Sequence, residues 1–449
     1  MVGKSASAQY LRFVSSVAQN WYLVMNDGVH PRHSGGALDG IRVLDLSRVL
    51  AGPWATQIFG DFGAQVLKVE RPGQGDDTRD WGPPFVSSEL EDSYAAYFTC
   101  CNRNKEALAV DFSRPEGAAL IRRLARHSDI LVENFRVGHL KKYGLDYNSL
   151  CSENPRLIYC SVTGFGQSGP YADRGGYDFL IQGMSGLMSV TGHPNDGPDA
   201  GPLKVGIPVS DLFTGLYVAI SALAALNHRN RTGEGQHIDC ALLDSQLATL
   251  SNQAAAYLID GIRPKAWGNE HPTVVPYRDF STADGRLLIA VVNDLQFQKL
   301  CSVLGCPDVA EDKRFQTNRD RNHNRRDLEN RLAPLIKRWP SEALLNAMEK
   351  AKLPCGPINT IDQILADPHV LSRDLVHTLY RDDGTAVRVI GYPHRLSRTP
   401  TSYRSAPPCL AQDTRRVLAK LLDLDEASLD ALEANGTIAN AVRSSQVID

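Results

Sequence analysis

The sequence predicts an α/β protein built on a parallel sheet with helices on both faces. From residue 38 onward, short aliphatic and β-branched runs alternate with longer segments of helical spacing. The short runs are apolar almost throughout, which is typical of strands that are buried on both sides. More strands and helices after residue 261 predict a second, smaller α/β unit. Ligands of such sheets bind beyond the carboxyl ends of the strands.

The expected strands and helices alternate along the chain. Residues 41–47 (IRVLDLS) form a β-branched strand, and a helix over 52–63 has Pro53 in its first turn, where a missing N–H costs nothing. The remaining expected elements are strands at 64–70, 129–135 and 155–164, helices at 115–128 and 212–226, a strand and long helix within 236–261, a strand at 285–292 and a helix at 414–422.

These elements suggest five segments. They are an N-terminal extension or targeting segment (1–37), the first part of a large domain (38–230), a linker strand and helix (231–261), a small domain (262–345) and a C-terminal return to the large domain (346–449). The first 25 residues contain Lys4 and Arg12, four serines and no acid. A mitochondrial presequence and a docking or disordered extension of a cytoplasmic protein both fit this composition.

Composition excludes several classes of protein. The 449 residues are 43% hydrophobic, which allows a large core. The 48 basic and 51 acidic residues give a net charge of −3 without like-charged blocks, so neither nucleic acid nor a membrane surface is an expected partner. The longest apolar stretch, after Asp211, is interrupted by polar residues, and no bilayer-spanning segment is expected. Nine scattered cysteines without CxxC spacing favour a reducing compartment and argue against both a disulfide framework and a thiolate zinc site.

Two motifs have competing interpretations. GFGQSG at 164–169 fits the GxGxxG pattern of a nicotinamide-dependent oxidoreductase, but Pro170 and a turn-rich segment follow it where a helix is needed, so a glycine turn is expected. Asp211 precedes a helix whose apolar residues recur at three- and four-residue spacing. Either it or Ser210 suits the helix cap, and a functional carboxylate at Asp211 is the other interpretation. His271 is a lone histidine, more typical of a loop or core than of a metal site.

A set of motifs from residue 38 to the C-terminus resembles the class III CoA-transferases, the group of formyl-CoA and carnitine CoA-transferases. The resemblance rests on their joint order: LDGIRVLDLSRVLAGPWATQIFGDFGAQVLKVERPGQGDDTR, NRNKEALAVDF, ILVENFRVGHL, YCSVTGFGQSGPYADRGGYD, RTGEGQHIDCALLDSQ and PCGPIN. WGPPF, GNEHPTVVPY and the overall length are most similar to the succinyl-CoA:glutarate branch. The resemblance implies a Rossmann-like large domain interrupted by a smaller one, in an intertwined, ring-like homodimer.

The resemblance also implies the chemistry. VSDLFTG matches the family's nucleophile segment and places the nucleophile at Asp211, where the helix dipole would keep the carboxylate ionised. CoA moves from a donor such as succinyl-CoA to a glutarate-like acid through an aspartyl-CoA thioester, with CoA as substrate and no permanently bound cofactor. The positions that match the family's CoA contacts are Leu50, Ala51, Arg71, Asn104, Lys105, Asn134, Phe135 and Lys142, with phosphates expected at Arg71, Lys105 and Lys142.

The family's mobile glycine-rich substrate loop corresponds to residues 267–272, with Gly268, Asn269 and His271, and His271 is a candidate partner for a distal carboxylate. Besides the NAD-dependent oxidoreductase considered for GFGQSG, two alternatives remain open. One is a racemase of the same fold, whose AGHD histidine is replaced here by Tyr177, a poor base at neutral pH; the adjacent Asp178 is expected to be structural. The other is a CoA-binding protein without activity.

Overall fold

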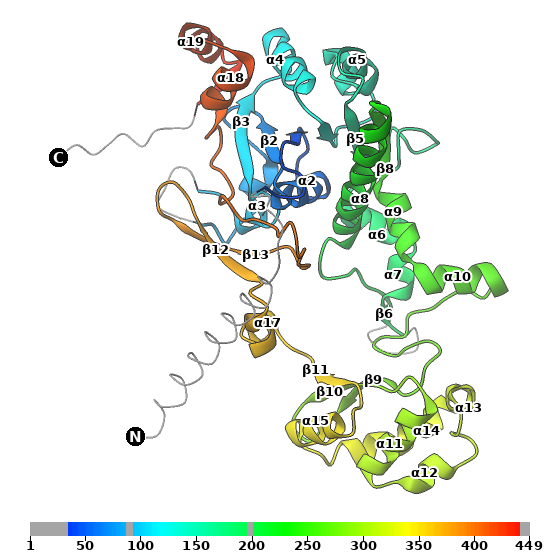
Figure 1. Cartoon of the computed structure of the whole chain (residues 1–449). Helices are drawn as coiled ribbons and strands as arrows, with labels where there is room; N and C mark the ends of the chain where they lie inside the picture. The colour runs from blue at the N-terminus through cyan, green and yellow to red at the C-terminus, as the bar shows by residue number, and fades with distance from the viewer. Residues whose placement is uncertain (1–34, 87–92, 195–200, 441–449) are drawn as a thin grey trace, which may run out of the picture. The chain divides into compact units, whose positions relative to one another are not determined.

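The computed structural model describes residues 35–86, 93–194 and 201–440 (Figure 1). The targeting interpretation of the N-terminal segment therefore concerns residues outside the described part. The described chain forms two compact units. The large unit comprises residues up to Ser185, Ile207–Thr249 and residues from Pro368 onward, and the small unit comprises Gly186–Gly206 and Leu250–Asp367.

A seven-stranded sheet forms the centre of the large unit. Its order is β14-β3-β2-β1-β4-β5-β8, and all neighbours are parallel except β14, which pairs antiparallel with β3. The strands are β1 (Arg42–Asp45), β2 (Gln65–Glu70), β3 (Lys105–Val110), β4 (Ile130–Glu133), β5 (Ile158–Thr163), β8 (Gln236–Ala241) and β14 (Ile438–Ala439). The prediction of an α/β protein with a parallel sheet is confirmed.

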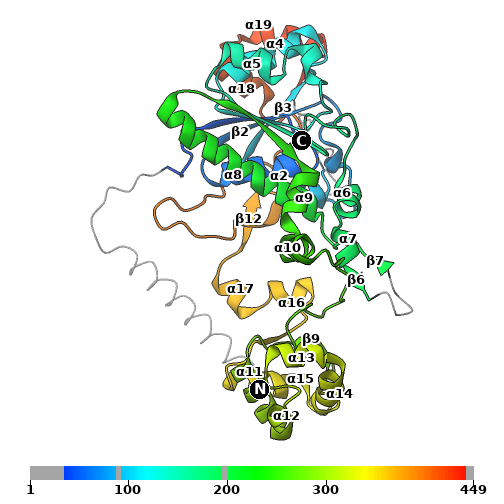
Figure 2. The ribbon, with the colours of Figure 1, turned by 90° about the vertical axis from the view of Figure 1, so that its right-hand side faces the viewer.

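Helices cover both faces of this sheet, and each face has its own apolar core (Figures 1 and 2). One face carries α2 (Ala51–Asp61), α6 (Asp178–Met184), α8 (Val209–Thr232) and α9 (Leu242–Thr249). The other carries α4 (Pro115–Arg126), α5 (Tyr147–Glu153), α18 (Thr414–Leu422) and α19 (Glu426–Ala434). In α4, Leu120, Ile121 and Leu124 follow the helical period and are buried, which explains why this segment docks as a helix.

Short elements complete the large unit. They are η1 (Asp77–Arg79), α3 (Ala96–Thr99), η2 (Leu140–Tyr143), α17 (Pro368–Ser372) and the β12–β13 hairpin (Val376–Tyr380 and Ala386–Ile390). η1 and α3 follow β2 and precede β3, so they lie in the chain connections next to the carboxyl end of β2. This is the edge at which a parallel sheet binds its ligand.

The small unit has a three-stranded antiparallel sheet with its own apolar core. Its strands are β9 (Tyr277–Ser281), β10 (Arg286–Ala290) and β11 (Cys355–Pro357), with β10 in the middle. The remaining elements are α7 (Leu187–Val190), β6 (Gly192–His193), β7 (Gly201–Pro202), α10 (Ser251–Asp260), α11 (Asp294–Leu304), α12 (Pro307–Glu311), α13 (Asn318–His323), α14 (Arg325–Ile336), α15 (Ser341–Lys350) and α16 (Ile361–Leu365).

The limits of the two units differ from the segments suggested by the sequence. The expected linker, 231–261, contains β8, which pairs with β5 along six residues and so belongs to the large sheet. The small unit extends to Asp367, well beyond residue 345, because β11 completes its sheet. A strand that pairs far from its neighbours in sequence gives no local sign of which sheet it joins.

α8 is apolar and long enough, by these two criteria alone, to cross a membrane. Its residues Val218, Ala219 and Ala222 are instead buried in the core shared with α2 and the sheet. A core helix of a globular protein has the same composition, so its packing decides between the two interpretations.

The backbone after β5 meets the backbone before α6 at two glycines. A Cβ atom on Gly176 would lie 2.5 Å from the Cα atom of Gly164, whereas a Cβ on Gly175 would meet no atom within 4 Å. We therefore expect Gly176→Ala to lower the free energy of unfolding by about 1–3 kcal/mol, because the backbones must separate. Gly175→Ala is the matched control and should change it by less than about 0.5 kcal/mol. Denaturant unfolding measures both, and equal effects would contradict this packing.

Candidate active site

Asp211 lies in the first turn of α8, two residues after the helix begins at Val209. The residue before the helix is Pro208, and α8 has no side-chain cap from its own N-cap residue. The prediction that Asp211 or Ser210 caps the helix is therefore wrong. The Ser210 N–H instead donates to Asp178 Oδ1 at 2.8 Å, so a side chain from α6 satisfies this amide.

Asp178 connects α6 to α8. Its Oδ2 accepts a hydrogen bond from Gln182 Nε2 at 2.7 Å, one turn later in α6, while its Oδ1 holds Ser210. Both carboxylate oxygens thus serve the junction between two helices. This arrangement agrees with the structural role expected for Asp178, and the preceding Tyr177 is 71% exposed.

Asp211 has an unusual electrostatic environment for a residue at a helix start. Its side chain is partly buried, and burial, followed by the negative charge of Asp178, raises its pKa to about 7. A helix dipole favours the ionised form of this carboxylate, whereas burial and Asp178 act in the opposite direction. A carboxylate that is close to half protonated at neutral pH and lies at a helix N-terminus is a candidate reactive group.

The structure explains why a glycine, Gly215, stands four residues after Asp211 in the segment VSDLFTG. A Cβ atom at Gly215 would lie only 2.6 Å from the Ala51 carbonyl oxygen and 3.1 Å from Trp54 Cδ1. Only glycine therefore allows α8 to approach the first turn of α2 so closely. Asp211 is one helical turn before Gly215, on the same side of α8. The structure thus brings Asp211 next to the start of α2, where Leu50 and Ala51 lie.

Tyr97 belongs to the surroundings of Asp211, although the sequence did not single it out. Burial first, and then the negative charge of Asp211, raise the pKa of the Tyr97 phenol. Its ring packs edge-on against Trp81, with 5.3 Å between the ring centroids. Tyr97 comes from the short helix α3, more than 100 residues from Asp211, and no local pattern in the sequence links the two.

The residues expected to contact CoA fall into two groups. In the first, the side chains are used inside the protein. Lys105 Nζ is fully buried and donates to Asp45 Oδ2, the Pro53 carbonyl and Asn102 Oδ1, each at 3.0 Å. An ammonium group has three protons, so these three bonds leave none for a phosphate. The expectation that Lys105 faces a phosphate is therefore not met in this structure.

Asn104 and Asn134 also use their amides internally. Asn104 Nδ2 donates to Asp61 Oδ1 at 2.9 Å and its Oδ1 accepts the Arg404 N–H at 2.7 Å, which ties the C-terminal return of the chain to the sheet. Asn134 Oδ1 accepts the Arg48 N–H at 2.9 Å and Asn134 Nδ2 donates to the Arg48 carbonyl at 2.7 Å. Their side chains support the backbone around the site.

The second group remains accessible. Arg71 and Lys142 are exposed cations; Arg71 donates to Gln74, and Lys142 Nζ lies 4.7 Å from the centre of the Tyr143 ring. Phe135 is partly buried and stacks on His139 at 5.4 Å. The side chains of Leu50 and Ala51 are buried, so only their backbone groups are able to face a ligand.

The expected substrate loop, 267–272, is in the small unit and is held by several contacts. The Gly268 N–H donates to the Gly192 carbonyl at 2.9 Å, and Asn269 Nδ2 donates to Asp279 Oδ1 at 3.2 Å. His271 Nδ1 accepts the N–H groups of Thr273 and Val274, both at 3.1 Å. The ring proton of neutral His271 therefore resides on Nε2, which is left to donate to another group.

The family model for CoA-transferase family III matches residues 38–414. The chain belongs to this family. The sequence-based recognition is confirmed, and the protein is an enzyme of the CoA-transferase class. This CoA-transferase is 48% identical over 392 residues to succinate–glutarate CoA-transferase of Agrobacterium fabrum, covering 87% of the chain and 97% of the relative.

Two further similarities agree with this assignment. The CoA-transferase is 40% identical over 401 residues to succinyl-CoA:glutarate CoA-transferase of Homo sapiens, covering 89% of the chain and 90% of the relative. A solved structure of a CAIB/BAIF family protein from Brucella suis matches with a TM-score of 0.77 at 46% identity, over 86% of this chain and all of that one. The fold and the sequence thus lead to the same family.

The glycine motif 164–169 has no dinucleotide-binding geometry in the CoA-transferase. Gly166 N–H donates to Thr163 Oγ1 and Gln167 N–H donates to Asp239 Oδ2, so these amides bind the protein itself. Turns follow, and the next helix, α6, begins only at Asp178. A pyrophosphate at a helix N-terminus is therefore not possible here, which removes the oxidoreductase alternative.

Lys105 and Lys142 allow a direct test of the division into internal and accessible residues. Lys105→Met should lower the free energy of unfolding by ~3–5 kcal/mol, because it leaves Asp45 buried without its cation. Lys142→Ala should leave thermal stability unchanged and weaken CoA binding by roughly fivefold, more at low salt. Lys141→Ala, which removes the neighbouring exposed charge, is the control. Calorimetry measures both the stability and the affinity for CoA. A Lys105→Met variant that lost affinity for CoA without losing stability would contradict the division into internal and accessible residues.

Proposed function

We propose that this enzyme transfers CoA from succinyl-CoA to a glutarate-like dicarboxylic acid, with Asp211 as the nucleophile. The observation that carries the proposal is the position of Asp211, partly buried in the first turn of α8 and next to the start of α2. The names of the similar enzymes from Agrobacterium fabrum and Homo sapiens support this pair of acids.

The proposed reaction begins when an Asp211 oxygen attacks the thioester carbonyl of succinyl-CoA. The C–S bond breaks, leaving a mixed anhydride of succinate and Asp211 together with the CoA thiolate. The thiolate then attacks the aspartyl carbonyl, succinate leaves, and an aspartyl-CoA thioester forms. The acceptor carboxylate attacks this thioester, and the released thiolate takes the acceptor's acyl group, which frees Asp211. The acyl bond energy is conserved at each step, so no nucleotide hydrolysis is needed.

The elements around Asp211 suit these steps. Each attack develops negative charge on a carbonyl oxygen, and backbone N–H groups at the starts of α8 and α2 favour such charge. Water must be kept away, because it would hydrolyse the anhydride. The rings of Tyr97 and Trp81 supply apolar surface near Asp211.

We propose that Arg71 and Lys142 bind CoA phosphates, that Phe135 contacts its apolar parts, and that the backbone of Leu50 and Ala51 faces the pantetheine or thioester end. Asn104, Lys105 and Asn134 contribute by holding this surface in place. CoA enters and leaves as a substrate, and we propose no permanently bound cofactor.

We further propose that Gly268, Asn269 and His271 belong to the acceptor site. Burial, followed by the positive charge of Arg325, lowers the pKa of His271. A neutral imidazole whose Nε2–H is free to donate would bind a carboxylate by a hydrogen bond and not by an ion pair.

We also propose an intertwined homodimer with a mitochondrial location. Apolar side chains are exposed on α8 and α10, including Ile220 at 60%, Leu258 at 81% and Ile259 at 86%. Clusters of exposed apolar residues usually mark an interface. The racemase alternative has less support, because both oxygens of Asp178 are engaged and Tyr177 replaces the histidine.

Trapping tests the nucleophile. The protein is mixed with succinyl-CoA, quenched in hydroxylamine and analysed by mass spectrometry. Wild-type enzyme should yield a hydroxamate on Asp211, and Asp211→Asn should yield none and lose at least roughly 10³-fold in kcat. Asp173→Asn, a change at an exposed acid on the surface, is the control. An adduct on another residue, or α-hydrogen exchange in a branched acyl-CoA without any adduct, would contradict the proposal.

The pKa of Asp211 predicts the pH dependence. Because the attacking form is ionised, kcat/KM should fall below about pH 7. Asp178→Asn removes the negative charge that raises this pKa and should move the acidic limb to lower pH, while Asp173→Asn should not. Because the pKa of Asp211 is higher in the folded than in the unfolded protein, its ionisation destabilises the fold at pH values above the unfolded-state pKa. Asp211→Asn removes this cost, so it should raise the unfolding temperature at pH 8 and not at pH 4. Unchanged profiles in Asp178→Asn would contradict this coupling.

A further inference from the structure

Val49 has a strained backbone at the turn between β1 and α2. Its φ is +69°, in the left-handed region. Among the described non-glycine residues with a positive φ, Val49 is the only one with a β-branched side chain. Such a conformation costs on the order of 1–3 kcal/mol and persists only where the surroundings impose it. The next residue, Leu50, is the N-cap of α2. The strain is therefore located immediately before the helix that lies next to Asp211.

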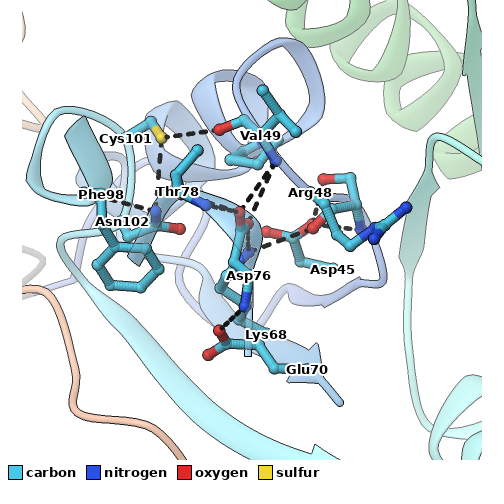
Figure 3. A network of polar contacts seen from close by, with 12 residues as sticks. Asp45, Arg48, Val49, Lys68, Glu70, Asp76, Thr78, Phe98, Cys101 and Asn102 are labelled. Carbon is cyan, nitrogen blue, oxygen red and sulfur yellow. Dashed lines mark hydrogen bonds and ion pairs between the residues drawn. The ribbon is translucent and has the colours of Figure 1, made fainter. Parts of the chain in front are cut away.

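Asp76 imposes this conformation from the β2 side. Its carboxylate accepts the Val49 N–H, at 3.3 Å to Oδ1 and 3.2 Å to Oδ2 (Figure 3). The same carboxylate accepts Thr78 N at 3.0 Å and Thr78 Oγ1 at 2.8 Å, and it forms an ion pair with Lys68 Nζ at 2.9 Å. The side chains of Asp76 and Lys68 are fully buried, so these oxygens have no freedom to move away.

Other residues hold the turn from its remaining sides. Cys101 Sγ, before β3, lies 3.6 Å from the Val49 carbonyl oxygen (Figure 3). Asn134, after β4, binds both the N–H and the carbonyl of Arg48. The turn from Arg48 to Val49 is thus fixed by chain segments that flank β2, β3 and β4. The backbone groups of Arg48 and Val49 thus receive more side-chain contacts than a simple connection from a strand to a helix needs.

We propose that Asp76 is a positioning residue for acyl-CoA binding: by holding Val49 in the left-handed conformation, it directs the N–H groups at the start of α2 toward the ligand. This inference rests on the proposed function, because it assumes that CoA meets the backbone of Leu50 and Ala51. Gly215, one helical turn after Asp211, packs against the Ala51 carbonyl at the start of the same helix.

The chemistry of Asp76 suits this task better than an amide would. A carboxylate accepts at both oxygens, and it is surrounded by the donors of Val49, Thr78 and Lys68. Burial opposes its ionisation, but the Lys68 ammonium and the Thr78 donors lower its pKa to about 2. Asp76 therefore keeps the same hydrogen bonds throughout the pH range in which Asp211 titrates.

The test is a double-mutant cycle between Asp76 and Val49, read by calorimetric binding of CoA and by KM for succinyl-CoA. Asp76→Asn should weaken CoA binding and raise this KM by roughly tenfold, with a smaller change in kcat. Adding Val49→Gly should restore at least part of the affinity, because glycine adopts a positive φ without strain. A residue that acts only on overall stability would show no such rescue.

Asp45→Asn provides the matched control. Asp45 is also fully buried and paired with a lysine, Lys105, but it makes no contact with Val49. If Asp45→Asn loses any affinity for CoA, adding Val49→Gly should not restore it, because Asp45 does not hold Val49. Equal responses of the two variants to Val49→Gly, or undiminished CoA affinity in folded Asp76→Asn, would overturn the proposal.

Asn134→Ala covers the case in which Asp76→Asn fails to fold, because it releases the same turn without exposing a buried charge. It should weaken CoA binding by several-fold, with an unfolding temperature close to that of the wild type, and unchanged affinity would overturn the proposal. CoA binding does not require chemistry, so this result is separate from the trapping of Asp211. Absence of the Asp211 adduct with normal CoA binding would reject the nucleophile and leave the positioning role in place.

Discussion

The contact between α2 and α8 at Gly215 is the constraint on which the site depends. A Cβ atom there would lie 2.6 Å from the Ala51 carbonyl, so any larger residue would push the two helices apart. This contact places the first turns of α2 and α8 side by side, with Asp211 in the first turn of α8. Two helix N-termini side by side produce a positive potential without any cationic side chain.

The cations at this end of the sheet stabilise the scaffold. Lys68 and Lys105 are fully buried and paired with Asp76 and Asp45. Buried pairs contribute little net stability, since desolvation offsets much of their attraction, but they hold backbone turns in place because breaking one partner is costly. Here the Asp76–Lys68 pair fixes the turn that precedes α2. Exposed cations such as Arg71 carry no such structural duty, and any interaction of theirs with an anion should depend on salt.

The sequence was sufficient for features that depend on periodicity or on joint motifs. The parallel sheet followed from buried strands alternating with helices, and the presence of a long helix around and after Asp211 followed from its apolar periodicity. The prediction that Asp211 or Ser210 caps α8 was wrong because the Ser210 N–H bonds to Asp178, 32 residues away. Capping rules consider only local residues. Lys105 and Asn104 were expected at the ligand because a motif does not tell which members touch a ligand and which hold the backbone that does. The place of β8 in the large sheet required knowledge of its partner, β5.

The raised pKa of Asp211 and the lowered pKa of Asp76 have a common physical origin. The Asp76 carboxylate is fully buried and that of Asp211 is partly buried, and burial by itself disfavours the charge of each. Asp76 has Lys68 and three N–H or O–H donors that compensate, so it is a fixed anion. Asp211 has instead a second anion, Asp178, nearby, so its charge is poorly stabilised in the resting enzyme. A carboxylate in that state gains more from bond formation with a thioester carbonyl than a well-solvated one does, since the charge it loses was costly to keep. The two aspartates thus differ in how readily they ionise because of the charges placed beside them, which are Lys68 at Asp76 and Asp178 at Asp211.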